Sequence, residues 1–433
     1  MIFTQLLAHV KKSSIFAQNW RIVSMKHLHL ENIGPITIVD IDLQRYNIFI
    51  GPQSSGKSTI AKMISFCTWI EKRALTTLSE DVFSNEQEFI EHVEEYHKMH
   101  DYFNEKSVLE YNSQNIHILY RDSKLSIKIL DKTSYKRKKI LYIPSDRNLV
   151  AMPRLDRLVV ETNTNLRSFI FDWFDARGAY DKSHRLSILD LNMEYYYDKD
   201  AKKVSQDRII HTNGKTYDIA LSDASSGLQS ITPLTLLLNY YTNQYFVDYG
   251  KTTSYKKDEE KKELEEKISL LFPVIIEDAQ NAKGLYNAIE RRSLFNKLTT
   301  PSSCDFIIEE PEQNLFPSTQ AQLISFLLNT CNEQNRAHSF TLTTHSPYIL
   351  TQLNILLFAG ILQKQRKKEQ VAQIVSPQMV ISPEELSVYA VQEEGTVVSI
   401  IDRQSNMISQ NYLDSVSEEL SIKFQQMYRL LFE

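Results

Sequence analysis

The residues that most directly suggest chemistry form a glycine-rich stretch near residue 50. The stretch Gly51-Pro-Gln-Ser-Ser-Gly-Lys57-Ser58 fits the pattern G-x-x-x-x-G-K-[ST]. Gly51 and Gly56 allow the backbone N–H groups to turn inward around phosphate groups. Lys57 is placed to reach the β- and γ-phosphates of a nucleotide, and the Ser58 hydroxyl can bind Mg²⁺. These residue types predict a phosphate-binding loop, with a chance match on a Gly/Ser turn as the alternative.

An expected strand and an expected helix flank this loop. Residues 46–50 form an apolar run rich in β-formers, and residues 59–70 carry apolar side chains at helical spacing. The order strand, loop, helix is the context that the motif requires. The helix N-terminus would add its partial positive charge toward the phosphates. The two flanks therefore favour the phosphate-binding loop over the chance match.

A second stretch ends in adjacent carboxylates. The apolar run at residues 304–308 is followed by Glu309, Glu310 and Pro311. Successive side chains on a strand point to opposite faces. One carboxylate could therefore join a Mg²⁺ shell while the other orients an attacking water, which is the division of labour that phosphoryl transfer needs. The alternative is a pair of exposed acids at the end of a strand.

Two further stretches fit the same chemistry less specifically. Residues 340–344 are expected to form a strand that ends at His345. A histidine at that edge can reach a γ-phosphate, and a purely structural histidine is the alternative. Ser225, Ser226 and Gly227 precede an apolar helix, which is an arrangement that binds anions or simply caps the helix.

Other polar residues allow two interpretations. Asp146 and Arg147 follow an expected strand at residues 140–144. They could contact the nucleotide or the metal shell, or they could form a structural salt bridge. His27 and His29 alternate with leucines, which favours the solvated face of a strand over metal ligands.

Composition restricts the class of protein. The chain has 433 residues, 24% of them charged, and a formal net charge of −5. This charge excludes a globally basic nucleic-acid binder but allows a local basic patch. The three cysteines, Cys67, Cys304 and Cys331, show no C-x-x-C spacing and suit a reducing cytosol. No apolar run approaches the roughly 20 residues that span a bilayer, so we expect a cytoplasmic protein without a membrane domain.

The order of the motifs predicts the fold class, which is α/β with a mixed, largely parallel core sheet, an antiparallel subsheet and a helical lobe. The strands before the phosphate-binding loop, the carboxylate pair and His345 should be parallel and adjacent. Residues 25–50 and 115–145 are expected to supply the antiparallel subsheet. The expected regions are an N-terminal extension at 1–24, a lobe with the phosphate-binding loop at 25–150, a helical lobe at 151–300, and the remaining core with a terminal hairpin and helix at 301–433.

Taken together, these motifs resemble the ATPase heads of the ABC/SMC type over about residues 25–430. They are more closely similar to the soluble bacterial AAA-like ATPases grouped with the OLD nucleases and with the ATPase subunits of anti-phage systems such as Septu and PARIS. The segments that carry the resemblance are residues 28–35, 51–58, 142–147, 224–229, 308–317 and 344–348. The resemblance implies a P-loop NTPase fold of the ABC-ATPase type, with ATP and Mg²⁺ as cofactors.

The resemblance also implies a role for each motif residue. Glu309 would bind the metal together with Ser58, Glu310 would be the general base, and His345 would be the switch histidine that acts with Lys57 in catalysis. The residues implied to bind phosphate are Gly51, Pro52, Gln53, Ser54, Ser55, Gly56, Lys57, Ser58 and Thr59. Ser225, Ser226 and Gly227 look like the signature motif that contacts the γ-phosphate of ATP bound to another subunit, which implies a head-to-head dimer.

The chain departs from the family pattern at several positions. The signature glutamine is displaced to Gln229, and Asn314 and Phe316 stand where OLD-like members often carry histidine. Residues 145–147 occupy the place of a Q-loop glutamine. The chain after the last motif is too short for a complete Toprim nuclease domain, so we expect any nuclease or toxin to be a separate chain.

Several functions are compatible with these motifs. The first is an ATPase whose ATP-dependent dimer or oligomer controls a separately encoded effector, a nuclease or toxin, in bacterial anti-phage defence. The second is a RecF/SMC-like DNA-repair ATPase that binds DNA, although no long coiled coils are evident. A transporter subunit would need a membrane partner. A sensor that binds ATP without hydrolysis would not need Glu310.

Overall fold

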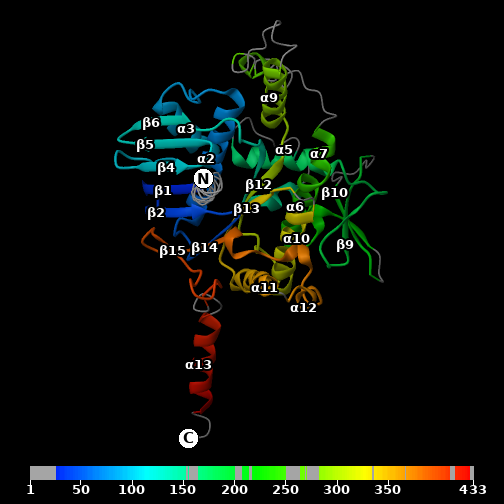
Figure 1. Cartoon of the computed structure of the whole chain (residues 1–433). Helices are drawn as coiled ribbons and strands as arrows, with labels where there is room; N and C mark the ends of the chain where they lie inside the picture. Colours follow the sequence, from blue (N-terminus) through cyan, green and yellow to red (C-terminus); the bar gives the residue numbers. More distant parts are fainter. Residues whose placement is uncertain are drawn as a thin grey trace, which may run out of the picture.

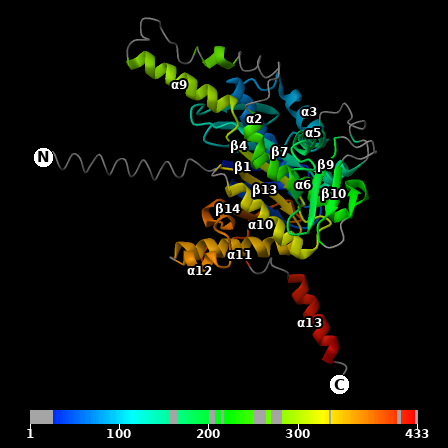
Figure 2. The ribbon, with the colours of Figure 1, turned by 90° about the vertical axis from the view of Figure 1, so that its right-hand side faces the viewer.

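The computed structural model describes residues 26–152, 155, 164–199, 207–213, 217–249, 264–268, 270, 282–333, 336–365, 367–409 and 415–429. The expected extension at residues 1–24 lies outside this range. Figures 1 and 2 show an α/β body from which the last helix, α13 (Ser415–Arg429), extends.

A six-stranded sheet forms the centre of the body, in the order β15-β14-β3-β13-β12-β7. Its strands are β3 (Tyr46–Ile50), β7 (Lys138–Ile143), β12 (Ser303–Glu309), β13 (Ser339–Thr344), β14 (Leu386–Val391) and β15 (Val397–Ser399). All neighbouring strands are parallel except β14 and β15, which are antiparallel. The strand before the phosphate-binding loop, β3, pairs with the histidine strand β13, which pairs with the acidic strand β12. The predicted parallel and adjacent arrangement is therefore confirmed.

The sequences of these strands suit a sheet that is covered on both faces. Every residue of β12 and β13 is buried. β12 contains the apolar run Phe306–Ile308, as expected where neither face meets water, whereas β13 combines Phe340 and Leu342 with buried serine and threonine side chains. Their carboxyl ends all lie at one edge, which is where ligands bind in open α/β sheets.

An antiparallel sheet lies beside the core, in the order β2-β1-β4-β5-β6. Its strands are β1 (Lys26–Ile33), β2 (Ile36–Leu43), β4 (Val108–Asn112), β5 (Ile116–Arg121) and β6 (Lys124–Ile129). The predicted composition of this sheet was partly wrong, because β3 and β7 belong to the core sheet instead. It also missed β4, which follows the short helix α3 (Glu86–His97) and lies outside both predicted ranges. The alternation of apolar and polar residues over Leu109–Asn112 is the sequence signal that identifies β4 as a strand.

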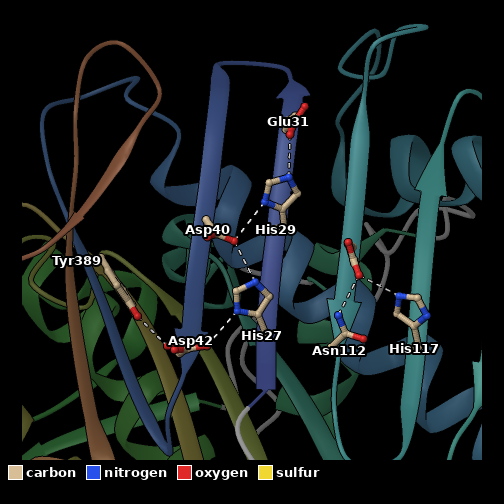
Figure 3. Close-up of polar contacts among 9 residues, drawn as sticks. His27, His29, Glu31, Asp40, Asp42, Asn112, His117 and Tyr389 are labelled. Carbon is tan, nitrogen blue, oxygen red and sulfur yellow. Dashed lines mark hydrogen bonds and ion pairs between the residues drawn. The ribbon is translucent and has the colours of Figure 1, made fainter.

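The outer face of this sheet carries alternating polar residues. His27 places one ring nitrogen 2.9 Å from Asp42 and the other 2.9 Å from Asp40. His29 contacts Asp40 and Glu31 in the same way (Figure 3). The inner residues of β1 are fully buried leucines. The interpretation of these histidines as the solvated face of a strand is confirmed.

Helix α2 (Lys57–Thr77) fills the space between the two sheets. Its apolar residues pack into the core of the antiparallel sheet, among them Ile60, Phe66 and Ile70. Ala61 contacts Tyr142 of β7 and Ile307 of β12 in the core sheet. Because α2 begins at the phosphate-binding loop, both sheets determine the position of that loop.

Helices cover the other face of the core sheet, and a small lobe extends from it. The remaining helices with described bounds are α5 (Asn165–Arg177), α6 (Ser226–Thr242), α7 (Gln244–Tyr249), α9 (Ala282–Thr299), α10 (Pro317–Glu333), α11 (Pro347–Lys364) and α12 (Lys368–Ala372). The region expected to be a helical lobe also contains a four-stranded antiparallel sheet of β8 (Leu186–Ser187), β9 (Met193–Tyr197), β10 (Asp207–His211) and β11 (Asp218–Ala220). Within the described part of the chain, no helix combines the length and apolarity needed to cross a bilayer.

The histidine contacts predict a pH-dependent contribution to stability. Burial opposes the charge on His27, but hydrogen bonds and the negative charges of Asp42 and Asp40 raise its pKa overall. The stabilisation should be complete below the unfolded value of about 6.5 and should disappear as pH rises through the raised folded pKa. It should amount to at most about 1 kcal/mol, because solvent screens these partly exposed pairs. The free energies of unfolding of wild type and His27→Gln, measured in urea, should therefore differ at pH 5.5 and become equal at pH 8.5. A difference that grows with pH would contradict this assignment.

Candidate nucleotide site

The phosphate-binding loop connects the end of β3 to the start of α2. Ser54 and Gly56 have positive φ angles of 61° and 103°. A Cβ atom on Gly56 would lie 2.4 Å from Cδ1 of Ile36, so only glycine fits there without movement. The N-terminus of α2 has no side-chain cap and no acidic residue in its first turn. Its N–H groups are thus left for an anionic ligand.

Two side chains of the loop show that it is shaped for an anion. Lys57 folds back and donates hydrogen bonds to the carbonyl oxygens of Gly51, at 3.0 Å, and Pro52, at 2.5 Å. Burial lowers the pKa of Lys57, while the negative charges of Glu310 and Glu312 oppose this shift. The buried hydroxyl of Ser55 has no hydrogen-bond partner among the described residues. An unpaired buried donor beside an ammonium group fits a phosphate oxygen.

Glu309, the last residue of β12, is buried, and hydrogen bonds from Tyr142 and Ser145 fix its carboxylate. Its Oε1 accepts a hydrogen bond from the Tyr142 hydroxyl at 2.7 Å, and its Oε2 accepts one from the N–H group of Ser145 at 3.4 Å. Burial, together with the negative charge of Glu309, raises the pKa of Tyr142 well above its usual value. Tyr142 therefore remains a donor and orients the carboxylate at the edge where α2 begins.

Glu310 adopts a left-handed backbone conformation, with φ 43°, and turns to His345. Its Oε1 lies 3.3 Å from Nε2 of His345 at the end of β13. This hydrogen bond lowers the pKa of Glu310, burial opposes the shift, and the positive charges of Lys57 and Arg147 add to it. The carboxylate is therefore kept ionised and can accept a proton.

The sequence did not reveal that Glu312 holds the backbone of His345 in place. Its Oε1 accepts a hydrogen bond from the N–H group of His345 at 2.6 Å. Its Oε2 is buried and has no partner among the described residues. Burial raises the pKa of Glu312, against the effect of the hydrogen bond from His345. The signal available in the sequence was only the short spacing of three acids around Pro311.

Arg147 lies beneath the site and does not face it. The fully buried guanidinium donates to the carbonyl oxygens of Glu309, at 2.9 Å, Glu310, at 2.8 Å, and Ser230, at 3.2 Å. Burial lowers its pKa to about 10, so it remains charged at neutral pH. Both interpretations of Arg147 from sequence, a ligand contact and a salt bridge, were wrong, because its partners are backbone carbonyls. The neighbouring Asp146 is exposed.

The serine turn before α6 lies close to the carboxylate loop. Ser225 caps α6 by accepting a hydrogen bond from the N–H group of Leu228 at 3.4 Å, and Ser226 is exposed. A Cβ atom on Gly227 would lie 3.0 Å from the carbonyl oxygen of Asn314. Gln229 donates to two carbonyls of its own turn, so it shapes this turn locally. The cap is thus confirmed, and contact with a second subunit stays a prediction.

The structure brings most of the predicted residues to one edge of the core sheet. The loop, Glu309, Glu310 and His345 follow the adjacent strands β3, β12 and β13. Within the described residues, no group of three or more His, Cys, Asp or Glu side chains could hold a metal ion by itself. A Mg²⁺ ion at Ser58 and Glu309 would therefore depend on phosphate and water oxygens for its other ligands, as is usual for this ion.

This arrangement defines a P-loop NTPase fold with a mixed core sheet. The sequence matches no protein-family model and no curated protein sequence. The chain is similar to the solved SMC head domain from Thermotoga maritima, with a TM-score of 0.36 and 11% identity over 87% of this chain and 99% of the other. It is also similar to an ATP-binding cassette of an ABC transporter, with a TM-score of 0.32 and 11% identity over 92% of this chain and 99% of the other. The recombination mediator protein RecF is similar with a TM-score of 0.30 and 9% identity over 87% of this chain and 98% of the other.

The contacts of Arg147 predict a structural role that can be separated from ligand binding. Arg147→Met would leave buried carbonyl oxygens without donors and should reduce the free energy of unfolding by about 3 kcal/mol or more. The exposed neighbour Asp146 supplies a control, because Asp146→Ala should change the free energy of unfolding by no more than about 0.5 kcal/mol. Denaturant unfolding without nucleotide measures both. An Arg147→Met protein of wild-type stability that fails to bind nucleotide would instead make Arg147 a ligand.

Proposed function

We propose that this chain binds Mg-ATP at the β3–α2 loop and hydrolyses it. The observation that carries the proposal is the convergence of Lys57, Glu309, Glu310 and His345 at the carboxyl ends of adjacent parallel strands. Each residue type suits one task in phosphoryl transfer, which depends on positioning and charge stabilisation.

The tasks follow from the observed contacts. Lys57 and the unpaired Ser55 hydroxyl bind phosphate oxygens, and Lys57 exchanges its present carbonyl partners for them. Glu309, oriented by Tyr142, and the Ser58 hydroxyl hold Mg²⁺, which would neutralise charge on the phosphates. Glu310 orients the attacking water and accepts its proton. His345 positions Glu310 through their hydrogen bond and lies where it can contact the γ-phosphate.

We further propose that ATP joins two copies of the chain head to head. This ATP-bound dimer would control a separately encoded effector in phage defence. Support for the dimer comes from the open serine turn at α6. Ser226 is exposed at the N-terminus of a 17-residue helix, where a second copy's nucleotide could approach. Support for the effector comes from the resemblance to anti-phage ATPases.

Substitution of the proposed base tests the chemistry. Glu310→Gln keeps the size of the side chain but cannot accept the proton, so kcat for ATP hydrolysis should fall about 10²–10⁴-fold. ATP binding should persist, because the phosphate contacts remain. Phosphate release and equilibrium binding measure the two effects. Glu393→Gln, an exposed acid in the terminal hairpin, is the control and should hydrolyse ATP normally. Wild-type turnover by Glu310→Gln would refute the assignment of the base.

The same variant tests the effector, because it should accumulate the ATP-bound state. We expect affinity purification from the native host with Mg-ATP to recover a nuclease-like or toxin-like chain, identified by mass spectrometry. The recovery should fall when nucleotide is omitted or when Lys57→Ala is used. Recovery of DNA and repair proteins without an effector would favour the RecF/SMC-like alternative.

A further inference from the structure

The last helix carries an apolar stripe on its surface. Leu420, Phe424 and Met427 of α13 are 58%, 64% and 61% exposed. Their spacing of four and three residues places them on one face, where Phe424 also stacks on Tyr428. Figures 1 and 2 show α13 extending away from the body. A helix of 15 residues is marginal in water by itself, so this face is expected to require a cover.

A second uncovered helical face lies on the body itself. Tyr348, Ile355 and Phe358 of α11 are 44%, 48% and 47% exposed, although the opposite face of this helix is buried in the main core. Their spacing of seven and three residues gives a single stripe, which Leu362 extends. The exposed Thr351 interrupts this stripe between Tyr348 and Ile355. A surface helix normally turns polar residues to solvent, so large apolar side chains on both sides of Thr351 mark an interaction site.

The two stripes match in length and in charge. The stripe on α11 covers 15 residues, from Tyr348 to Leu362, and α13 also has 15, so both are about 22 Å long. The chain beyond the end of α11 is basic, with Lys367 and Lys368, whereas the sequence at the start of α13 includes Glu418 and Glu419. Antiparallel packing brings the acidic start of the α13 sequence to the basic end of α11 and also opposes the two helix dipoles.

We propose that α13 of one copy packs antiparallel on the exposed face of α11 in a second copy, and that two copies exchange these helices reciprocally. The chain leaves the body beside α11, because the N–H group of Ile408 donates to Asn354 of α11 at 2.9 Å. A two-fold exchange therefore gathers both α13–α11 contacts into one interface. This interface is separate from the head-to-head contact at α6. It also connects to the nucleotide site, because α11 is capped by Ser346, which directly follows His345.

The test measures mass at several protein concentrations by analytical ultracentrifugation of the full chain without nucleotide. Wild type should form a dimer. Phe424→Glu in α13 and Phe358→Glu in α11 should each weaken it about tenfold or more, because a charge would enter an apolar contact. Ile422→Glu is the matched control, since Ile422 lies on the opposite face of α13 and is also half exposed. It should dimerise like wild type.

Mixing the two variants tests the exchange itself. A Phe424→Glu copy has an intact α11, and a Phe358→Glu copy has an intact α13. The mixture should regain a heterodimer, weaker than wild type because one of two contacts is restored. A wild-type chain that stays monomeric, as with α13 folded onto its own α11, overturns the proposal. So does wild-type dimerisation by Phe358→Glu, which would indicate pairing between two α13 helices or another contact. Because no nucleotide is present, either outcome leaves the ATPase proposal untouched.

Discussion

The site depends on one buried cation. The guanidinium of Arg147 joins the end of β12, the start of the following loop and the first turns of α6, in each case through backbone carbonyl oxygens. Contacts to backbone carbonyl oxygens do not depend on which side chains the partner residues carry. They do require accurate positions of the carbonyl groups, because a guanidinium presents its donors in a fixed plane. The backbone of Glu310 is thus held in its left-handed conformation, and the turn before α6 is kept at a constant distance from the carboxylates.

The charges around the loop explain why the site suits an anion together with a divalent cation. The negative charges of Glu310 and Glu312 act on Lys57, and those of Glu309, Glu310 and Glu312 act on Arg147, whose guanidinium donates to backbone carbonyl oxygens. A nucleotide triphosphate would add further negative charge to this set. A Mg²⁺ ion between the phosphates and Glu309 would restore the balance, in line with the usual preference of this ion for one or two carboxylates plus phosphate oxygens.

The sequence predicted those parts of the fold that depend on local patterns. The phosphate-binding loop, the acidic strand, the histidine strand and the terminal hairpin follow from glycine spacing and short apolar runs, and their adjacency follows from the rules of parallel sheets. What could not be predicted depends on contacts between distant residues. β4 joins β1 across about 75 residues of intervening sequence, although its other neighbour, β5, follows it directly, and β14 joins β3 across more than 300 residues. Arg147 and Glu312 have backbone partners, and no pattern of side chains reveals such partners.

The position of β14 has a consequence for how the protein is made. β14 lies directly beside β3, and a Cβ atom on Gly51 would come within 2.2 Å of the carbonyl oxygen of Val391. The loop at residue 51 therefore reaches its final shape only after residue 391 has left the ribosome. β3 has neither of its neighbours until β13 has been made, because β14 follows later still. At usual rates of synthesis this leaves β3 unpaired for roughly 15–60 s. The growing chain must keep β3 covered during that time, and α2 and the antiparallel sheet are the first elements available to do so.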